Sequence, residues 1–448
     1  MSWSTLSSTA SPWHTHPHEI ALVRACAAAH TSPERNARIQ TLLTYDLDWE
    51  VVLSQARRHG VEAMLLQQVH DCGSFPDEAR ATLHAQSRMT AHFNMHRLHV
   101  LLQFLQRCDQ AGCRVVSFKG AVLAQRYYGN LAFRRFADLD VLVAPHEVPQ
   151  VKAILHDMGF ESLRSQAGES QALEAQIGIE MRRAADQVVV EIHTELINKT
   201  LAYPLYADGV LARAVRTPIG TQSIYTMAPD DLLLYLCAHG TKHHWARLKW
   251  VADVAHMLHH HPDLDAEALC CRAADLHCER VLLLGVHVAA RWLDTPIHDA
   301  FAAAIARDPV VGELAHYIET SWLCTDAGLD RTIRLQQVRF FSRTRRRWRD
   351  RWPIWGEYMR RSLEPSERDR AFADLPTLLT PLYLLVRPAR VVCDWLGSAE
   401  ENGKASIDQP PHIPAEPALQ GTMPQETVPS APVRKEAAAR QVVESVSP

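Results

Sequence analysis

Apolar residues recur at three- and four-residue spacing through the first hundred positions, a pattern typical of helices. Asp48 is placed to cap one helix, whose apolar positions run from Val51 to Val69. A second run with helical spacing extends from Pro76 to Ala111. We therefore predict an N-terminal helical region over residues 1–111.

The pattern changes at Gly112, where short apolar runs alternate with short helical ones. We expect strands at 113–118, 136–143 and 159–163, helices at 121–128 and 147–158, and a hairpin of 177–183 with 187–193 that turns at 184–186. Strands and helices mixed in this way predict a small mixed β-sheet within residues 112–228.

Helical spacing returns after Pro229. We expect helices at about 230–244, 248–260, 265–276, 278–293 and 311–322, within a C-terminal helical region of residues 229–396. Residues 397–448 are rich in Pro, Ala, Glu and Gln and lack periodic apolar positions, so we predict a disordered tail. The predicted fold class is α+β, with a small mixed sheet flanked by helical regions on both sides.

Composition narrows the class of protein. The 448 residues are 47% hydrophobic, and 47 Lys and Arg against 51 Asp and Glu leave a net charge of −4, which does not indicate a general nucleic-acid binder. None of the 10 Cys forms a C-x-x-C pair, and the first residues lack the basic start and apolar run of a signal peptide. The apolar stretch 375–395 is interrupted by Pro and charged residues, so we do not expect it to span a membrane. We predict a cytoplasmic protein with reduced thiols.

The sharpest chemical feature is a pair of carboxylates, Asp138 and Asp140, within an apolar run. Residues two apart on a strand point to the same face, so the two carboxylates would repel each other unless a cation lies between them. Mg²⁺ prefers carboxylate oxygens and leaves positions open for phosphate oxygens. Glu191, in another apolar strand, could complete a two-metal site for an in-line displacement. The alternative is that these are solvent-facing acids at strand ends.

A strand ending in Lys119-Gly120 precedes the carboxylate pair. A Gly at a strand–helix junction lets a phosphate approach the backbone. This context favours a nucleotide site over isolated surface acids.

Several segments together resemble the uncharacterised nucleotidyltransferase family, a branch of the polymerase-β-like superfamily. They are Trp49 to Gln67, Phe118 to Ala124 with Tyr127-Tyr128, Arg134-x-x-x-Asp138-Leu139-Asp140-Val141-Leu142-Val143, Val190-Glu191-Ile192-His193, and Asp231 to Leu248 followed by Trp250 and Asp253. Lys119-Gly120 stands where the superfamily usually has Gly-Ser, and Thr194 stands where the family often has Trp.

The resemblance implies a transferase that moves a nucleoside monophosphate from an NTP to an unknown acceptor, which could be a small molecule, a protein or RNA. Asp138 and Asp140 would bind two Mg²⁺ (or Mn²⁺) ions, and Glu191 would be a third ligand or the base. Lys119 and Arg134 would contact phosphate oxygens. The alternative is a catalytically silent protein that keeps the fold for binding or as a scaffold.

Two further clusters carry candidate chemistry. His239 and His243 lie four apart on an expected helix and could bind zinc with Asp253. A helical wall that brings His239 and Lys242 to the nucleotide cleft, or a role in packing or capping, fits the pattern better. Trp245 could stack on a base or anchor the core. Six of the nine residues in the Arg343–Arg351 segment are Arg, which could contact an anionic partner or form a solvated helix face.

Overall fold

The computed structural model describes residues 16–29, 32–70, 72–73, 75–164, 178–197, 205–321 and 331–363, and six more between 372 and 386. The chain divides into two units, residues 1–364 and 365–448. All the elements below belong to the first unit. In the second unit, the Tyr383 hydroxyl donates to the carbonyl of Ala373 at 2.8 Å. The tail predicted from residue 397 lies outside the described residues, and the division into four regions stays a prediction.

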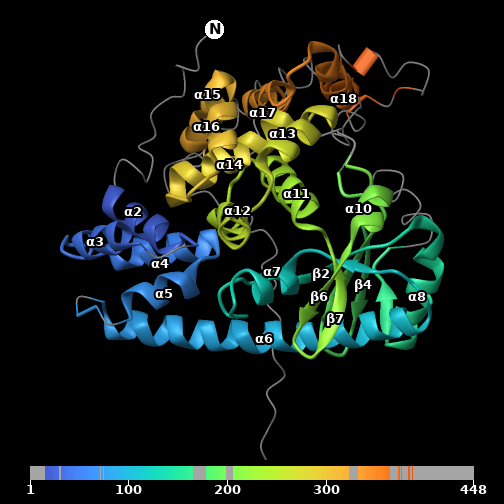
Figure 1. Ribbon diagram of the computed structural model, residues 1–448, viewed down its shortest axis with the longest axis horizontal. Helices are drawn as coiled ribbons and strands as arrows, with labels where there is room; N and C mark the ends of the chain where they lie inside the picture. Colours follow the sequence, from blue (N-terminus) through green and yellow to red (C-terminus); the bar gives the residue numbers. More distant parts are fainter. Residues whose placement is uncertain are drawn as a thin grey trace, which may run out of the picture. The chain divides into compact units, whose positions relative to one another are not determined.

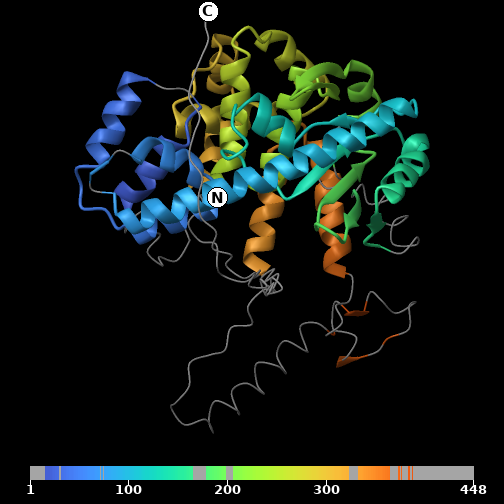
Figure 2. The same cartoon turned by 90° about the horizontal axis from the view of Figure 1, so that it is seen from below.

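The N-terminal region is helical, as predicted, but the single helix expected over residues 51–69 is two helices, because Gly60 ends the first one in a left-handed conformation. Its helices are α2 (Pro17–Cys26), α3 (Pro33–Leu42), α4 (Trp49–His59), α5 (Glu62–Val69) and the 34-residue α6 (Asp77–Gln110). The predicted cap is confirmed, because the Asp48 side chain accepts from the backbone N–H of Val51 at 3.1 Å. The helix α6 continues from this region along the sheet (Figures 1 and 2).

A seven-stranded mixed sheet follows, in the order β3-β4-β5-β2-β1-β7-β6. Its strands are β1 (Val116–Ser117), β2 (Asp138–Leu142), β3 (Phe160–Ser162), β4 (Ile179–Arg183), β5 (Val189–His193), β6 (Val215–Ile219) and β7 (Gln222–Thr226). The helices between them are α7 (Gly120–Arg126), α8 (Val148–Asp157), which follows a 3-10 turn (Pro145–Glu147), and α10 (Ala207–Arg213). The predicted α+β class is confirmed.

The predicted β4–β5 hairpin is present, but the hairpin of β6 and β7 was not predicted. Pro218 lies within β6, and Val215 and Arg216 on this strand are exposed, so apolar alternation is weak there. The strand β6 lies at the edge of the sheet, where Pro is tolerated because its missing N–H costs no ladder hydrogen bond.

The two faces of the sheet have different roles. Leu139 and Val141 of β2, with Val190 and Ile192 of β5, point into a hydrophobic core that they share with α6 and α8. Because side chains alternate along a strand, the intervening polar residues of β2 and β5 point to the opposite face. In Figure 1 the sheet separates α6 from the C-terminal helices, so this polar face is turned towards those helices.

The C-terminal region is again helical. Its helices are α11 (Pro229–Lys242), α12 (Leu248–His260), α13 (Ala266–Asp275), α14 (Glu279–Leu293), α15 (Asp299–Arg307), α16 (Pro309–Ser321), α17 (Arg331–Arg343) and α18 (Trp352–Leu363), with a 3-10 turn at Trp348–Arg351. No helix among the described residues is long and apolar enough to cross a membrane.

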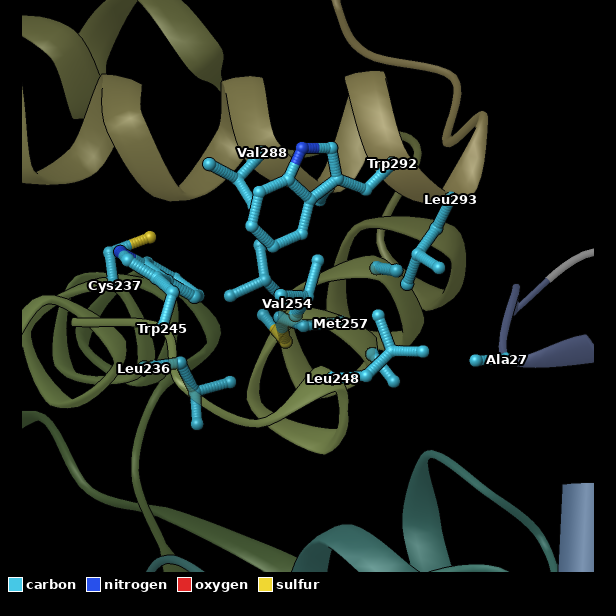
Figure 3. Close-up of a cluster of buried hydrophobic side chains, with 14 of the residues drawn as sticks. Ala27, Leu236, Cys237, Trp245, Leu248, Val254, Met257, Val288, Trp292 and Leu293 are labelled. Carbon is cyan, nitrogen blue, oxygen red and sulfur yellow. The ribbon is translucent and has the colours of Figure 1, made fainter. Parts of the chain in front are cut away.

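Trp245 anchors the core of this region and is fully buried among side chains of α11, α12 and α14 (Figure 3). The packing is close, because a Cβ added at Gly240 would lie 2.4 Å from the indole ring. The interpretation of Trp245 as a core anchor is therefore the right one, and its ring does not face a ligand.

One buried ion pair joins the helical region to the sheet. The guanidinium of Arg134, in the segment before β2, donates to both carboxylate oxygens of Asp253 on α12, at 2.7 and 2.9 Å. The hydroxyl of Tyr128 donates to the same carboxylate at 2.8 Å. Arg134, Asp253 and Tyr128 are all buried, so water cannot compensate either charge of the ion pair when its partner is removed.

We predict that Arg134→Leu or Asp253→Leu alone lowers the free energy of unfolding by about 3–5 kcal/mol, because each leaves an uncompensated buried charge. The double variant should lose clearly less than the sum of the single losses. Urea unfolding of the four proteins measures this coupling, and additive losses would contradict it.

A second prediction concerns acid stability. Burial, with help from Arg58 and Arg247, lowers the pKa of His59 from 6.5 to about 3, and its Nδ1 accepts from the backbone N–H of Leu248 at 3.3 Å. The unfolded chain therefore binds this proton more readily, and stability should fall as pH drops from 6.5 towards 3, by about 1.4 kcal/mol per pH unit.

His59→Asn should make the free energy of unfolding less dependent on pH between 6.5 and 5, while the exposed His84→Asn should leave that dependence unchanged. Equal slopes for all three proteins would show that His59 does not resist protonation.

Candidate active site

The parallel pairing of β2 with β5 assembles a cluster of acids. Asp140 lies opposite Glu191 in the register, and Asp138 lies opposite Val189. Ligand atoms of Asp140, Glu191 and His193 all lie within 4.8 Å of one another. Asp138, two residues before Asp140, points to the same face. The three predicted acids therefore share one face of the sheet.

Lys119 supplies the opposing charge. Its Nζ donates to Oδ1 of Asp140 at 2.5 Å, and Nε2 of His193 lies 3.1 Å from the same oxygen and 3.5 Å from Oε2 of Glu191. Burial disfavours ionisation of Asp140, but Lys119 and His193 outweigh it and hold its pKa well below the ordinary value. Burial likewise opposes a charged His193, yet its hydrogen bonds to Asp140 and Glu191 raise its pKa.

The two remaining acids differ in how readily they bind a proton. Burial and the neighbouring Asp140 raise the pKa of Asp138. Burial also disfavours a charged Glu191, but His193 outweighs it and lowers the pKa of that carboxyl. In the metal-free protein, Asp138 therefore binds a proton more readily than Glu191 does.

Asp138 and Glu191 line a cavity of about 240 Å³, called here the acidic cavity, and α11 forms another wall of it. Lys119, Asp138, Glu191 and His193 line one side, and Tyr235, His239, Lys242 and His243 line the other. The structure thus brings His239 and Lys242 to the acids from about a hundred residues further along the chain, as the helical wall requires.

Histidines on this wall are held neutral. Burial, reinforced by Lys119 and His243, lowers the pKa of His239 well below its ordinary value. Burial and the adjacent Lys242 lower the pKa of His243 to about 4. Burial and then Lys119 also lower the pKa of Lys242. Protonation of the histidines on this wall is therefore unfavourable in the free protein, and a bound anion would make it less so.

Two predicted phosphate contacts have other surroundings in the structure. Arg134 does not line the acidic cavity, because its guanidinium is bound to Asp253. Gly120 is buried with a φ of +43°, and an added Cβ would lie 3.2 Å from the carbonyl oxygen of Asp138 and 3.3 Å from the Phe136 ring. The absence of a side chain at Gly120 thus permits the close contact between α7 and β2, and its role in the approach of a phosphate stays a prediction.

The geometry also weighs against the zinc hypothesis. The pair His239 and His243 has no third ligand in Asp253, since that carboxylate is bound to Arg134 and Tyr128. Within the described part of the chain, the one group of three possible ligands is that of Asp140, Glu191 and His193. His193 was missed as a site residue, although its position two residues after Glu191 already placed it on the same face.

The arginine segment 343–351 is partly used within the fold. Arg345 is buried, Arg343 pairs with Glu313, and Arg346 pairs with Glu279 at 3.0 Å. Trp348 and Trp352 remain 70% and 63% exposed. An anionic partner for this segment stays a prediction.

Gly178 leaves room for the side chain of Glu191. A Cβ at this position would lie 2.5 Å from Cγ and 2.6 Å from Oε1 of Glu191. We predict that Gly178→Ala displaces this carboxylate and weakens Mn²⁺ binding at least tenfold, with about 1 kcal/mol or less of lost stability, because a side chain can move more cheaply than backbone.

Isothermal titration with Mn²⁺ and urea unfolding measure the two effects. Gly312→Ala is the matched control, because a Cβ at that helical position meets no atom within 4 Å. Unchanged Mn²⁺ affinity in Gly178→Ala would show that Glu191 does not hold the ion.

Comparison with known proteins agrees with this geometry. Searches of curated proteins and of solved structures give no match. The uncharacterised nucleotidyltransferase family matches residues 45–294, more than half of the chain. This range contains the acid cluster, Lys119 and the whole of α11. The chain therefore belongs to the uncharacterised nucleotidyltransferase family.

Proposed function

We propose that the protein is a Mg²⁺-dependent enzyme that transfers a nucleoside monophosphate from an NTP to an acceptor. The observation that carries this proposal is the convergence of Asp138, Asp140 and Glu191 on one sheet face, beside a cavity whose far wall carries Lys242. Membership in a nucleotidyltransferase family supports the same reaction class.

The donor set fits a divalent ion. Carboxylate oxygens of Asp138, Asp140 and Glu191 are hard ligands of the kind that Mg²⁺ and Mn²⁺ prefer. His193, whose pKa is raised, acts here as a hydrogen-bond donor to two of these carboxylates. When bound, two ions would neutralise charge on the α-phosphate and on the pyrophosphate leaving group.

The chain's own cations hold the triphosphate. Lys119 and Lys242 both line the acidic cavity, and ammonium groups bind phosphate oxygens strongly when partly desolvated. Neutral His239 and His243 can donate a ring N–H without adding charge. Helix α11 also excludes water, so that transfer to the acceptor can compete with hydrolysis.

The reaction needs a proton acceptor. The acceptor's oxygen or nitrogen forms a bond to the α-phosphorus, the bond from that phosphorus to the pyrophosphate oxygen breaks, and pyrophosphate leaves. The proton passes to a carboxylate oxygen of the acid cluster, and Glu191, the third acid of the set, is the candidate base.

The proposal is tested by incubating the protein with each α-labelled NTP, Mg²⁺ and a cell extract, and searching for a labelled product. We expect Glu191→Gln to lower labelling by about 10³-fold or more, roughly 4 kcal/mol in the barrier, and removal of Mg²⁺ with a chelator to abolish it. Glu161→Gln, an exposed acid on edge strand β3, is the matched control.

Asp140→Asn should also abolish labelling, but it removes the partner of buried Lys119, so its folding must be checked by circular dichroism. Labelling of no product by any NTP, in a protein that folds and binds Mn²⁺, would favour the alternative of a silent binding or scaffold protein.

A further inference from the structure

A second cavity lies between the N-terminal helices and the start of β2. It has a volume of about 350 Å³ and is lined by α4, α5, one face of α6 and the segment that leads into β2. Ala137 lines this cavity, whereas the next residue, Asp138, lines the acidic cavity. The two cavities are therefore lined by consecutive residues of the chain, and the Asp138 carboxylate acts electrostatically on Arg97.

The second cavity is cationic, and we call it the arginine cavity after Arg57, Arg97 and Arg135, which line it. Among the described residues, no hydrogen bond or ion pair engages these three guanidinium groups, although Arg97 lies 5.7 Å from the centre of the Phe93 ring. Glu62 is the single acid in the lining. Burial raises the pKa of Glu62 against the opposing effect of Arg135 and Arg57, so one partly buried acid faces three arginines.

Buried polar atoms in the lining lack partners. Asn94 is fully buried, and its Nδ2 donates to the carbonyls of Leu131 and Arg134 at 2.6 and 3.0 Å, which fixes Oδ1 as an acceptor. That Oδ1, Oε1 of Gln86 and Nε of Arg97 are all buried without a hydrogen-bond partner. Because unpaired buried polar atoms are costly, three of them beside one cavity favour a further hydrogen-bonding partner there, either water or a ligand.

Spacing along α6 shows that these groups form one surface. Gln86, Thr90, Asn94 and Arg97 follow one another at intervals of four, four and three residues, which is one face of a helix. Met89 and Phe93 flank them and are 55% and 50% exposed. The same face thus offers a hydrogen-bond acceptor, a cation and an apolar surface.

We infer that the arginine cavity binds the acceptor of the transfer reaction, a small molecule that carries an oxyanion, carboxylate or phosphate, together with a hydroxyl or amine. The arginines hold the oxyanion, and Oδ1 of Asn94 accepts from the hydroxyl or amine. Phe93 covers the apolar part of the molecule. The identification of the ligand as the acceptor rests on the proposed function, whereas the existence of the binding site does not.

The binding site is tested without metal or NTP. Isothermal titration uses glycerol 3-phosphate, glycerate, inorganic phosphate and glycerol as probes. We expect one of the first two to bind more tightly than inorganic phosphate, glycerol to show no binding, and affinity to fall with added salt. The tighter of glycerol 3-phosphate and glycerate identifies which oxyanion the cavity selects.

The double variant Arg97→Met/Arg135→Met should weaken binding of that probe tenfold or more, because two charge-assisted contacts are lost. Arg88→Met, an exposed position on α6 outside the cavity, should leave it unchanged. Equal affinity of the double variant and the unaltered protein, with melting temperatures that show both are folded, would overturn the inference. No binding of any probe would also overturn it.

NTP affinity separates the acceptor from the nucleotide. The double variant should bind NTP with Mn²⁺ as the unaltered protein does, and a tenfold loss would assign the cavity to the triphosphate and overturn the acceptor assignment. Glu191→Gln should keep probe binding and lose transfer. Retained transfer in Glu191→Gln would refute the proposed function while probe binding still reports on the cavity.

Discussion

Like charges brought together on one face of a sheet are the constraint around which this protein is built. Parallel pairing of β2 with β5 sets Asp140 opposite Glu191, and strand periodicity adds Asp138 to the same face. Lys119 and His193 compensate part of this charge in the free protein, and they do so from within hydrogen-bonding distance of one oxygen. The site is therefore assembled before any ligand arrives, with Lys119 as its internal counter-ion.

The C-terminal helices cover the polar face of the sheet and complete the site. A small sheet exposes its polar face to water, and α11 covers that face with His239 and Lys242 directed at the acids. The joint of Arg134 with Asp253 fixes α12 against the same unit, and Trp245 fixes α11 against α12 and α14. Arg134 thus serves the site by positioning its wall, which explains why an arginine close to the acids in sequence does not face the cavity.

Most of the fold could be predicted from periodicity, because amphipathic helices such as α12 and α14 carry strong signals. The edge hairpin of β6 and β7 could not, since Pro218 and exposed residues mask its alternation. At the site, spacing alone placed Asp138, Asp140 and Glu191 on one face. The partner of Arg134 is Asp253, which lies 119 residues away in the sequence. The close approach of Gly178 to Glu191 depends on the register of a hairpin. Such contacts between distant segments leave no local pattern in the sequence.

The length of α6 has a mechanical consequence. Its 34 residues make a rod of about 50 Å that packs under the N-terminal helices at one end and beneath the sheet at the other. A rod shared by two cores acts as a strut, so the N-terminal helices cannot swing away from β2 without bending it. The width of the arginine cavity, which is bordered by the middle of this strut, is therefore set by a rigid spacer, whereas the acidic cavity is bordered by the shorter α11. Entry and exit of substrates should then depend on motion of α11, while α6 stays fixed.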